Sequence, residues 1–401
     1  MQMIDSPDHR AFLIADARRQ LGFFAASLTP DGRFAVLDHD GAPLPDTGQE
    51  LHTTTRLIHA YALGRLLDAP RADAIIDAGM AALWTRHRDA DHGGFYWSFD
   101  AQGPARDDKL AYGHVFVLLA GASAAQVGHP DAARLIDAAD RVLTDRFWDQ
   151  ERGLFADEFR RDWQPFSSYR GMNANMHGAE ALLAAHEATG RADFLHKAGR
   201  ILDFFVTRMA PAQGWRLPEH YTADWQIDPD YRGDPMFRPA GTTPGHSLEI
   251  ARLALQHWVL SGRPDDGTPD RARALIQTAL RDAWRADGGL VYTLGRGGAP
   301  AVRDRYWWPV TEAIGAVASL LRLDPRPGDA DWYARLWDFA QAHLIDAERG
   351  GWFPELDEAG RPAAHQFIGK PDIYHALQAD LIPLAPGPAH LFDGLRAALS
   401  G

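Results

Sequence analysis

The 401-residue chain contains no cysteine, which excludes disulfides, zinc–thiolate sites, iron–sulfur clusters and thiol nucleophiles. It also lacks an excess of basic residues. Forty-one Lys and Arg residues stand against 54 Asp and Glu residues, which gives a formal net charge of −13. Because proteins bind nucleic-acid phosphates through basic surfaces, this balance argues against a nucleic-acid partner.

Long apolar runs are missing as well. No run reaches the roughly 18–20 residues that cross a bilayer, so no membrane partner is expected. The opening segment MQMIDSPDHRAFLIADARRQ lacks the basic and apolar stretches of a secretion signal, which predicts a cytoplasmic protein. The composition is that of a globular protein, because 46% of the residues are apolar and 24% are charged.

A short element recurs six times along the chain. Each copy combines a polar turn, one or two glycines, and aromatic or apolar residues in short alternation, as in HGGFYWSFD and GGWFPELD. Successive copies lie 59 to 75 residues apart, a regularity that indicates an internal repeat. The glycines that mark the copies are Gly32, Gly94, Gly153, Gly214, Gly289 and Gly351.

Helical patterns flank each marker glycine. Apolar residues follow helical spacing between Ile136 and Phe147, just before Gly153, and NANMHGAEALLAAHEATG forms a second helical stretch after it. Six units of two helices and one β-hairpin-like turn predict an all-α, closed (α/α)6 barrel. An open solenoid usually carries polar capping repeats, and none is evident. We expect residues 1–401 to form a single catalytic domain.

Polar residues recur at one position of the repeat. Arg56, His177 and His375 each lie 24 residues after a marker glycine, and Glu312 lies 23 residues after its own. Equivalent positions in a ring of helix pairs face a common centre, so these four side chains are expected to meet there. Each residue alone is compatible with a packing or ion-pair role. Burying all four only for structure would be costly, which favours a functional centre.

The segment TTPGH predicts a histidine in the first turn of a helix. Thr243 is the expected N-cap, Pro244 the first helical residue, and His246 follows in the first turn. The positive end of the helix dipole disfavours an imidazolium there and maintains the neutral form that a general base needs. Glu249 lies three residues later on the same face and is expected to orient the ring.

Two further proline dipeptides predict helix starts. Residues 308–309 are expected to open the helix that carries Glu312, and residues 370–371 the helix that carries His375. Trp308 lies at the first of these starts. Its ring suits stacking on the face of a sugar.

No metal or cofactor site is predicted. The chain has 18 histidines but no HExxH motif. His87 and His92 are five residues apart, lie in a charged turn and are expected to be solvated. The segment GRGGAP lacks the strand–helix context of a phosphate-binding loop.

Four blocks carry a resemblance to a known family: RYWWPVTEAIGA, YRGMNANMHGAEALL, FRPAGTTPGHSLEIARLAL and GKPDIYHALQADLIP. Together they resemble the N-acylglucosamine 2-epimerase superfamily, a group of (α/α)6 barrels, from about residue 8 to residue 386. RGMNANMH, PEHYTADW and FRPAGTTPGH are most similar to its aldose–ketose isomerase branch. The resemblance implies a metal-independent isomerase, active as a monomer or homodimer on a monosaccharide. D-mannose and D-fructose are the expected pair, with D-lyxose and D-xylulose as further candidates.

The resemblance also implies residue roles. His246 would open the sugar ring, and His375 would carry a proton between C2 and C1 through a cis-enediol(ate). Arg56 and His177 would stabilise the enediolate oxygens. Glu249 and Glu312 would orient the histidines. The residues placed around the sugar are Arg56, Tyr112, Asn173, His177, Glu180, Glu249, Trp308 and Glu312.

The chain departs from this family pattern at three positions. Met236 stands where the sulfoquinovose isomerases carry an arginine, two positions before the residue that matches Arg238, and this favours a neutral sugar. His52 stands where relatives often have a tryptophan, which removes a stacking partner. Ile250 likewise replaces a tryptophan common after the matching glutamate.

Other functions stay open on the sequence alone. A 2-epimerase acting on mannose, cellobiose or N-acylglucosamine would use the same two histidines, and a sulfoquinovose isomerase remains possible. A glycoside hydrolase would need two carboxylates flanking a bond, with Glu249 and Glu312 as the expected pair. A non-catalytic sugar-binding barrel explains two histidines at helix starts least well.

Overall fold

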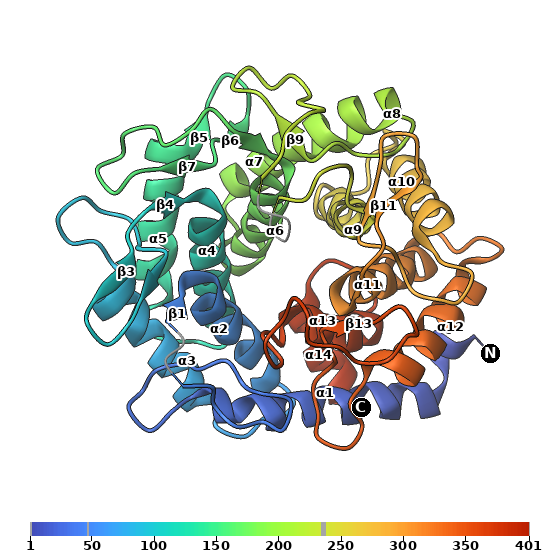
Figure 1. The fold of residues 1–401 in the computed structure, drawn as a ribbon, viewed down its shortest axis with the longest axis horizontal. Helices are drawn as coiled ribbons and strands as arrows, with labels where there is room; N and C mark the ends of the chain where they lie inside the picture. Colours follow the sequence, from blue (N-terminus) through green and yellow to red (C-terminus); the bar gives the residue numbers. More distant parts are fainter. Residues whose placement is uncertain (1, 46–47, 234–237, 401) are drawn as a thin grey trace.

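The computed structural model describes residues 2–45, 48–233 and 238–400. Within these ranges, six inner helices surround the centre of the molecule and six outer helices lie around them (Figure 1). The inner helices are α2 (Leu51–Arg65), α4 (Ala111–Gln126), α6 (Met172–Thr189), α9 (Pro244–Leu260), α11 (Trp307–Leu323) and α13 (Tyr374–Leu381). The outer helices are α1 (Pro7–Phe24), α3 (Ala72–Ala82), α5 (Ala132–Val142), α7 (Ala192–Leu202), α10 (Thr268–Ala283) and α12 (Asp329–Phe339).

The ring of inner helices is closed. Each inner helix packs against the next one along the chain, and α13 packs back against α2. The predicted (α/α)6 barrel is therefore confirmed. Shorter helical segments complete the described chain. They are α8 (Ala210–Ala212), α14 (Leu391–Leu399), 3-10 turns at Met3–Asp5, Ala25–Ser27 and Ile382–Leu384, and π-helical turns at Leu83–His87, Leu143–Phe147, Asp203–Met209 and Ala340–Leu344.

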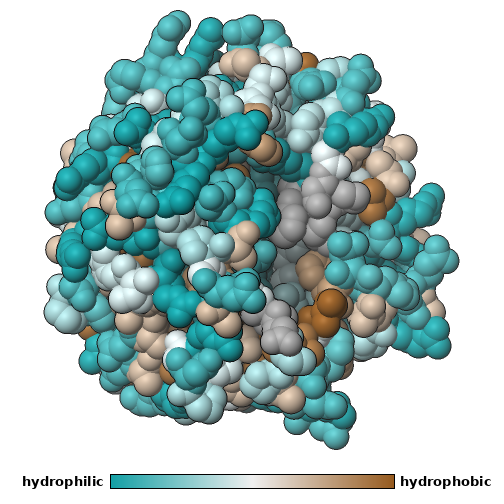
Figure 2. All heavy atoms as spheres, turned by 60° about the vertical axis from the view of Figure 1, so that its left-hand side comes forward, coloured by the Kyte–Doolittle hydropathy of each residue, from teal (hydrophilic) through white to brown (hydrophobic). Residues whose placement is uncertain are grey.

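Inner and outer helices differ in sequence because they differ in burial. Helix α4 has no charged residue and is buried on nearly every face, since it packs between the barrel centre and the outer ring. Helix α5 buries only Ala132, Leu135, Ile136 and Ala139, which follow one helical stripe. The face of the molecule shown in Figure 2 is accordingly covered mostly by hydrophilic residues. None of the helices described is long and apolar enough to span a membrane.

The marker glycines form the turns that link the helix pairs. All six have a φ between +61° and +80°, a backbone region that glycine enters without the steric cost of a Cβ. Short antiparallel strands lie beside these turns and before the inner helices. They are β1 (Gln49–Glu50), β2 (Ser98–Phe99), β3 (Pro104–Arg106), β4 (Lys109–Leu110), β5 (Trp148–Asp149), β6 (Leu154–Phe155), β7 (Glu158–Phe159), β8 (Arg170–Gly171), β9 (His220–Tyr221), β10 (Thr293–Leu294), β11 (Pro300–Val302), β12 (Arg305–Tyr306) and β13 (Glu355–Leu356).

Strand pairing joins neighbouring repeats at one end of the barrel. The segment before an inner helix pairs with the turn of the next repeat in β1–β2, β4–β7, β8–β9 and β12–β13. Single bridges do the same between Thr242 and Leu294, and between Leu37 and Lys370. The last bridge links the first repeat to the sixth. This end of the barrel therefore holds the first turns of all six inner helices.

The predicted helix starts are correct in two cases and wrong in one. Helix α9 begins at Pro244 with Thr243 as its N-cap residue, and α11 begins at Trp307, one residue before the predicted start. Helix α13 begins only at Tyr374. The prediction failed there because Lys370 is held in the bridge to Leu37, so the chain before Tyr374 is extended or turned rather than helical.

Candidate active site

A cavity of about 220 Å³ opens among the first turns of the inner helices. All six inner helices contribute side chains to it, as expected if equivalent positions of the repeat face a common centre. Of the predicted site residues, it is lined by Arg56, Tyr112, Asn173, His177, His246, Glu249, Trp308 and His375. Glu180 and Glu312 are buried behind this lining, where each contacts a histidine. A larger depression of about 950 Å³ beside α7 lies on the outer wall and contains none of these groups.

His375 is held by Glu312, as predicted. The Nδ1 atom of His375 lies 2.8 Å from Oε1 of Glu312, and Arg252 donates to the other oxygen at 3.2 Å. Although burial alone would raise it, Arg252 and His375 hold the pKa of Glu312 below its ordinary value. A carboxylate can only accept hydrogen bonds, so Nδ1 carries a hydrogen, and in the neutral ring the lone pair lies on Nε2.

His246 has a different partner from the one predicted. Its Nδ1 atom lies 2.9 Å from Oε2 of Glu219, whereas Glu249 lies 3.4 Å from the Nδ1 atom of His177. The expectation that Glu249 orients His246 is therefore wrong. It failed because a rule for neighbours on one helix cannot detect a partner 27 residues earlier on a loop.

Trp308 lies against both histidines. Its ring centroid is 5.0 Å from that of His246 and 5.8 Å from that of His375. Gly245 permits this approach, because a Cβ there would overlap the Trp308 ring. Within the described chain, neither Nε2 atom of the two histidines has a hydrogen-bond partner. The cavity thus presents two imidazole nitrogens beside an aromatic surface that can support a sugar ring.

His177 forms a third histidine–carboxylate pair. Its Nδ1 atom lies 3.2 Å from Oε2 of Glu180, which also accepts a hydrogen bond from the hydroxyl of Tyr374. Burial lowers the pKa of His177 to about 4, so the ring is neutral near pH 7. Asn173 lines the same wall, and its buried Oδ1 atom has no partner in the described chain.

Arg56 is the cationic side chain among the described residues that line the cavity. It donates to Asp372 at 2.6 Å and to the hydroxyl of Tyr112 at 2.8 Å. Its guanidinium also lies 4.5 Å from the ring centroid of Phe116, which fixes its orientation further. Asp372 was not among the predicted site residues; it lies before the start of α13 and pairs with an arginine 316 residues earlier in the chain.

Glu249 differs from the other buried carboxyls. Both of its oxygens are buried without a hydrogen-bond donor within the described ranges. Burial, together with the negative charges of Glu312 and Glu180, raises the pKa of Glu249 well above its ordinary value. This shift favours the protonated form of the side chain, which can donate a hydrogen bond where a carboxylate can only accept one.

The buried acids and histidines also have spacings compatible with metal ligands. One donor atom from each of Glu249, Glu312 and His375 lies within 4.8 Å of the others, and His177 and Glu180 form a similar group with Glu249. Arg252 donates to one of these acids, Glu312, at 3.2 Å, so that carboxylate is partly compensated by a protein cation.

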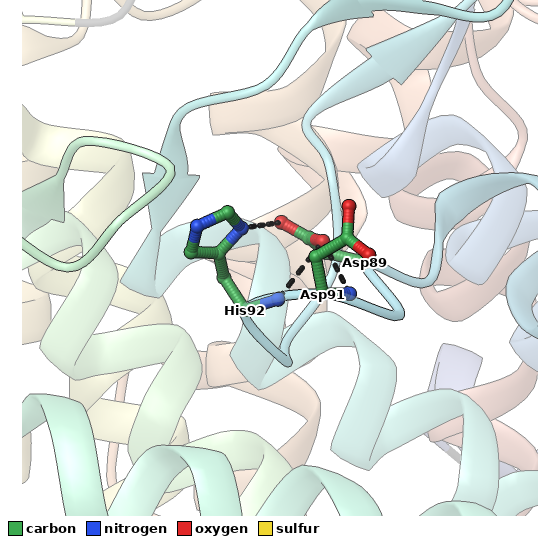
Figure 3. Close-up of side chains that lie close together, drawn as sticks. All are labelled: Asp89, Asp91 and His92. Carbon is green, nitrogen blue, oxygen red and sulfur yellow. Dashed lines mark hydrogen bonds and ion pairs between the residues drawn. The ribbon is translucent and has the colours of Figure 1, made fainter.

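A second group of possible ligands lies outside the cavity. Figure 3 shows the His92 ring directed at the Asp89 carboxylate, with Asp91 beside it. Lys109 donates to Asp89 at 2.9 Å and Arg161 donates at 3.0 Å, so this carboxylate is already neutralised by protein cations. These three side chains therefore belong to an ion-pair network with Lys109 and Arg161.

The prediction that His87 is solvated is wrong. Its side chain is fully buried, with Nε2 3.0 Å from the Thr54 hydroxyl and Nδ1 3.1 Å from the carbonyl oxygen of Tyr96. His87 ends a π-helical turn that packs under the hairpin, so its charged neighbours in the sequence do not share its environment. His92 is partly exposed, as expected.

The three positions at which the chain departs from the family pattern lie in different parts of the protein. His52 lines the cavity and stacks on Trp97, with ring centroids 5.1 Å apart, so aromatic rings still cover this wall. Ile250 is buried away from the cavity lining. Met236 lies outside the described residues. Arg238 is paired with Glu158 at 2.7 Å.

Comparison with known proteins agrees with this geometry. Residues 32–379 match the family model for N-acylglucosamine 2-epimerase (GlcNAc 2-epimerase). The chain is 43% identical to a D-mannose isomerase of Thermobifida fusca, over 94% of this chain and 95% of that protein. It is 38% identical to a D-mannose isomerase of Pseudomonas cannabina pv. alisalensis, over 99% and 96%. A crystal structure of a D-mannose isomerase superposes with a TM-score of 0.88 at 31% identity, covering 93% of this chain and 97% of that one. The chain therefore belongs to the N-acylglucosamine 2-epimerase family, and it is a sugar isomerase.

Proposed function

We propose that this isomerase interconverts D-mannose and D-fructose without a metal ion, with D-lyxose and D-xylulose as secondary substrates. The observation that carries the proposal is the pair of histidines on α9 and α13, the two inner helices that flank α11. Each has Nδ1 on a carboxylate and Nε2 directed to the same cavity. Such imidazoles can accept and return protons near neutral pH. The names of the two relatives above support mannose as the sugar.

In the proposed reaction, His246 first opens the pyranose ring. It takes the proton of the C1 hydroxyl and delivers a proton to the ring oxygen, which gives the open-chain aldose. His375 then removes the C2 proton, so electrons of the C2–H bond form the C1–C2 double bond of a cis-enediol(ate). A proton then moves from the C2 oxygen to the C1 oxygen of this intermediate, and the same imidazole returns its proton to C1 as the C2 oxygen becomes the ketose carbonyl.

The negative charge of this intermediate develops on the sugar oxygens. Arg56, already oriented by Asp372, and the neutral His177 are proposed to donate hydrogen bonds to those oxygens. The protonated Glu249 is a third proposed donor. Donors fixed before the reaction need little reorganisation when the charge appears, which is the source of their catalytic effect.

The charges of the cavity favour a neutral sugar. The guanidinium of Arg56 is compensated by Asp372 at 2.6 Å, and Arg238 is compensated by Glu158. A sulfonate or phosphate would therefore find no free cation among the described residues of the lining. This argument opposes sulfoquinovose as the substrate.

A glycoside hydrolase is disfavoured by the same geometry. Both oxygens of Glu312 are engaged, one by His375 and the other by Arg252, and Glu312 does not line the cavity. It therefore cannot flank a glycosidic bond opposite Glu249. A 2-epimerase is distinguished from an isomerase only by its product.

The test is incubation with D-mannose in D2O containing EDTA, followed by NMR of the products. Fructose that carries deuterium at C1, with little glucose, is the expected result. Glucose as the main product would replace the proposal by a 2-epimerase. Activity that EDTA abolishes and added metal restores would contradict the metal-free mechanism.

A further inference from the structure

Two buried carboxylates occupy equivalent positions in consecutive repeats, and one of them is Asp157. Its peptide oxygen accepts the amide hydrogen of Ala111, the first residue of α4, at 2.8 Å. Its side-chain Oδ2 accepts the amide hydrogen of Gly171, which directly precedes α6, at 2.8 Å. Asp157 thus connects the starts of two adjacent inner helices.

Glu219 repeats this arrangement one unit later. Its peptide oxygen accepts the amide hydrogen of Met172, the first residue of α6, at 2.9 Å. Its side-chain Oε1 accepts the amide hydrogen of Thr243, which directly precedes α9, at 3.1 Å. The two residues therefore share one structural task at the same end of the barrel.

The difference between them is one methylene group. The longer side chain of Glu219 brings its second oxygen, Oε2, to 2.9 Å from Nδ1 of His246, while Oε1 remains on the backbone. At the equivalent position of α6, three residues after Gly171, the chain carries Ala174, so Asp157 has no histidine to contact. Glu219 lies in the PEHYTADW block and is 3% exposed.

We infer that Glu219 is a positioning residue that fixes both the ring orientation and the tautomer of His246. Because its carboxylate only accepts hydrogen bonds, the imidazole hydrogen is kept on Nδ1 and the lone pair on Nε2 faces the cavity. Thr243 holds the other oxygen, so the carboxylate cannot rotate away. This inference rests on the proposed isomerase reaction, in which Nε2 of His246 exchanges protons with the sugar.

Glu219→Gln tests the tautomer. A glutamine has one acceptor oxygen for two donors, so with that oxygen on Thr243 its NH2 group faces Nδ1 and moves the imidazole hydrogen to Nε2. We expect kcat for mannose to fall about 10²- to 10⁴-fold with a smaller change in KM, as is general when a catalytic histidine is held in the wrong tautomer. In 15N NMR, the His246 signal should change from an unprotonated Nε2 to an unprotonated Nδ1. His246→Asn identifies that signal by its loss.

Glu219→Asp separates the two tasks of the side chain. An aspartate is expected to keep the backbone bond, as Asp157 does, but not to reach His246. It should therefore retain the wild-type melting temperature more fully than Glu219→Gln and lose a comparable part of kcat. Asp157→Asn is the matched control at the equivalent position. It should leave kcat and the His246 signal unchanged.

The results for these three variants decide whether Glu219 positions His246. Wild-type kcat and an unchanged His246 signal in Glu219→Gln would overturn it, as would full activity of Glu219→Asp. An equal loss of kcat in Asp157→Asn would also overturn it, since the loss would then come from the barrel end as a whole. If the wild-type protein does not convert mannose, the proposed function fails, while the 15N signals still report whether Glu219 sets the tautomer.

Discussion

Two groups of buried charged residues lie at the same end of the barrel. They differ in how many of their polar atoms are bonded to a partner. In the ion-pair network under the second hairpin, Lys109 and Asp89 are both fully buried and lie 2.9 Å apart, with Arg161 as a second cation. In the cavity, the Nε2 atoms of His246 and His375 and both oxygens of Glu249 lack hydrogen-bond partners in the described chain. Similar residue types therefore stabilise the fold in one region and remain available for chemistry in the other.

A second buried lysine–aspartate pair occurs elsewhere at this end of the barrel. Lys370 donates to Asp346 at 2.7 Å, and both side chains are almost fully buried. Like Asp89, Asp346 begins a glycine turn, with its peptide groups bonded to Gly350 and Gly351. Each lysine lies in the segment that leads to an inner helix. A buried lysine–aspartate pair at this place therefore recurs in two repeats of the barrel.

The largest effect that would sharpen this comparison is expected for His375→Ala. Loss of the proposed base should lower kcat for mannose by about 10⁴-fold or more, equivalent to about 5 kcal/mol in the barrier. Deuterium exchange at C2 should disappear as well, while the melting temperature changes little. A variant that still exchanges deuterium at C2 would assign the base role elsewhere.

Lys109→Met should show the opposite behaviour. Removing one partner of a fully buried pair leaves the Asp89 carboxylate with less compensation, at a cost of about 3–5 kcal/mol in the free energy of unfolding. Urea unfolding measures this loss. The kcat of the folded fraction should remain within about twofold, because Lys109 does not line the cavity. A large loss of kcat without loss of stability would break the comparison.

An effect of intermediate size is expected for Asp157, whose contribution to the free energy of unfolding depends on pH. Burial raises the pKa of Asp157 to about 7 from an ordinary value of 3.8. The folded state therefore binds this proton more tightly than the unfolded state. Its contribution to stability is full below pH 3.8 and is lost as the pH rises to about 7, by about 2–4 kcal/mol. In Asp157→Asn, this part of the pH dependence should be absent from denaturation curves; an unchanged slope would show that Asp157 is already ionised at lower pH.

The smallest effect is expected for Glu249→Gln. Because the raised pKa of Glu249 favours its protonated form, an amide resembles that form both in charge and in its ability to donate a hydrogen bond. We expect kcat/KM near pH 7 to change by less than about tenfold. Glu312→Gln is the matched control, since the ionised Glu312 supports His375, and its loss should be much larger. Equal losses in the two variants would show that Glu249 acts as a carboxylate.

The repeat in the sequence determined the architecture and most of the cavity. Helical spacing and turn glycines are local signals, and six nearly equal repeats leave few ways to bury their apolar faces other than a closed ring. Equivalent positions then face the centre, which is why Arg56, His177 and His375 were expected to meet and do line one cavity. Glu312, which was expected at the same centre, lies behind this lining and contacts His375.

Only the tertiary structure decided which group contacts which. Glu219 reaches His246 from a loop in the preceding repeat, Asp372 pairs with Arg56 across the ring closure, and His87 is buried under its own hairpin. Counting residues from each marker glycine identifies equivalent helix positions but gives no information on these contacts. The contacts depend on how backbone bridges join the loops of neighbouring repeats. The sequence by itself determined which helix faces meet at the centre, whereas the partners that set the protonation of each group depended on closure of the barrel.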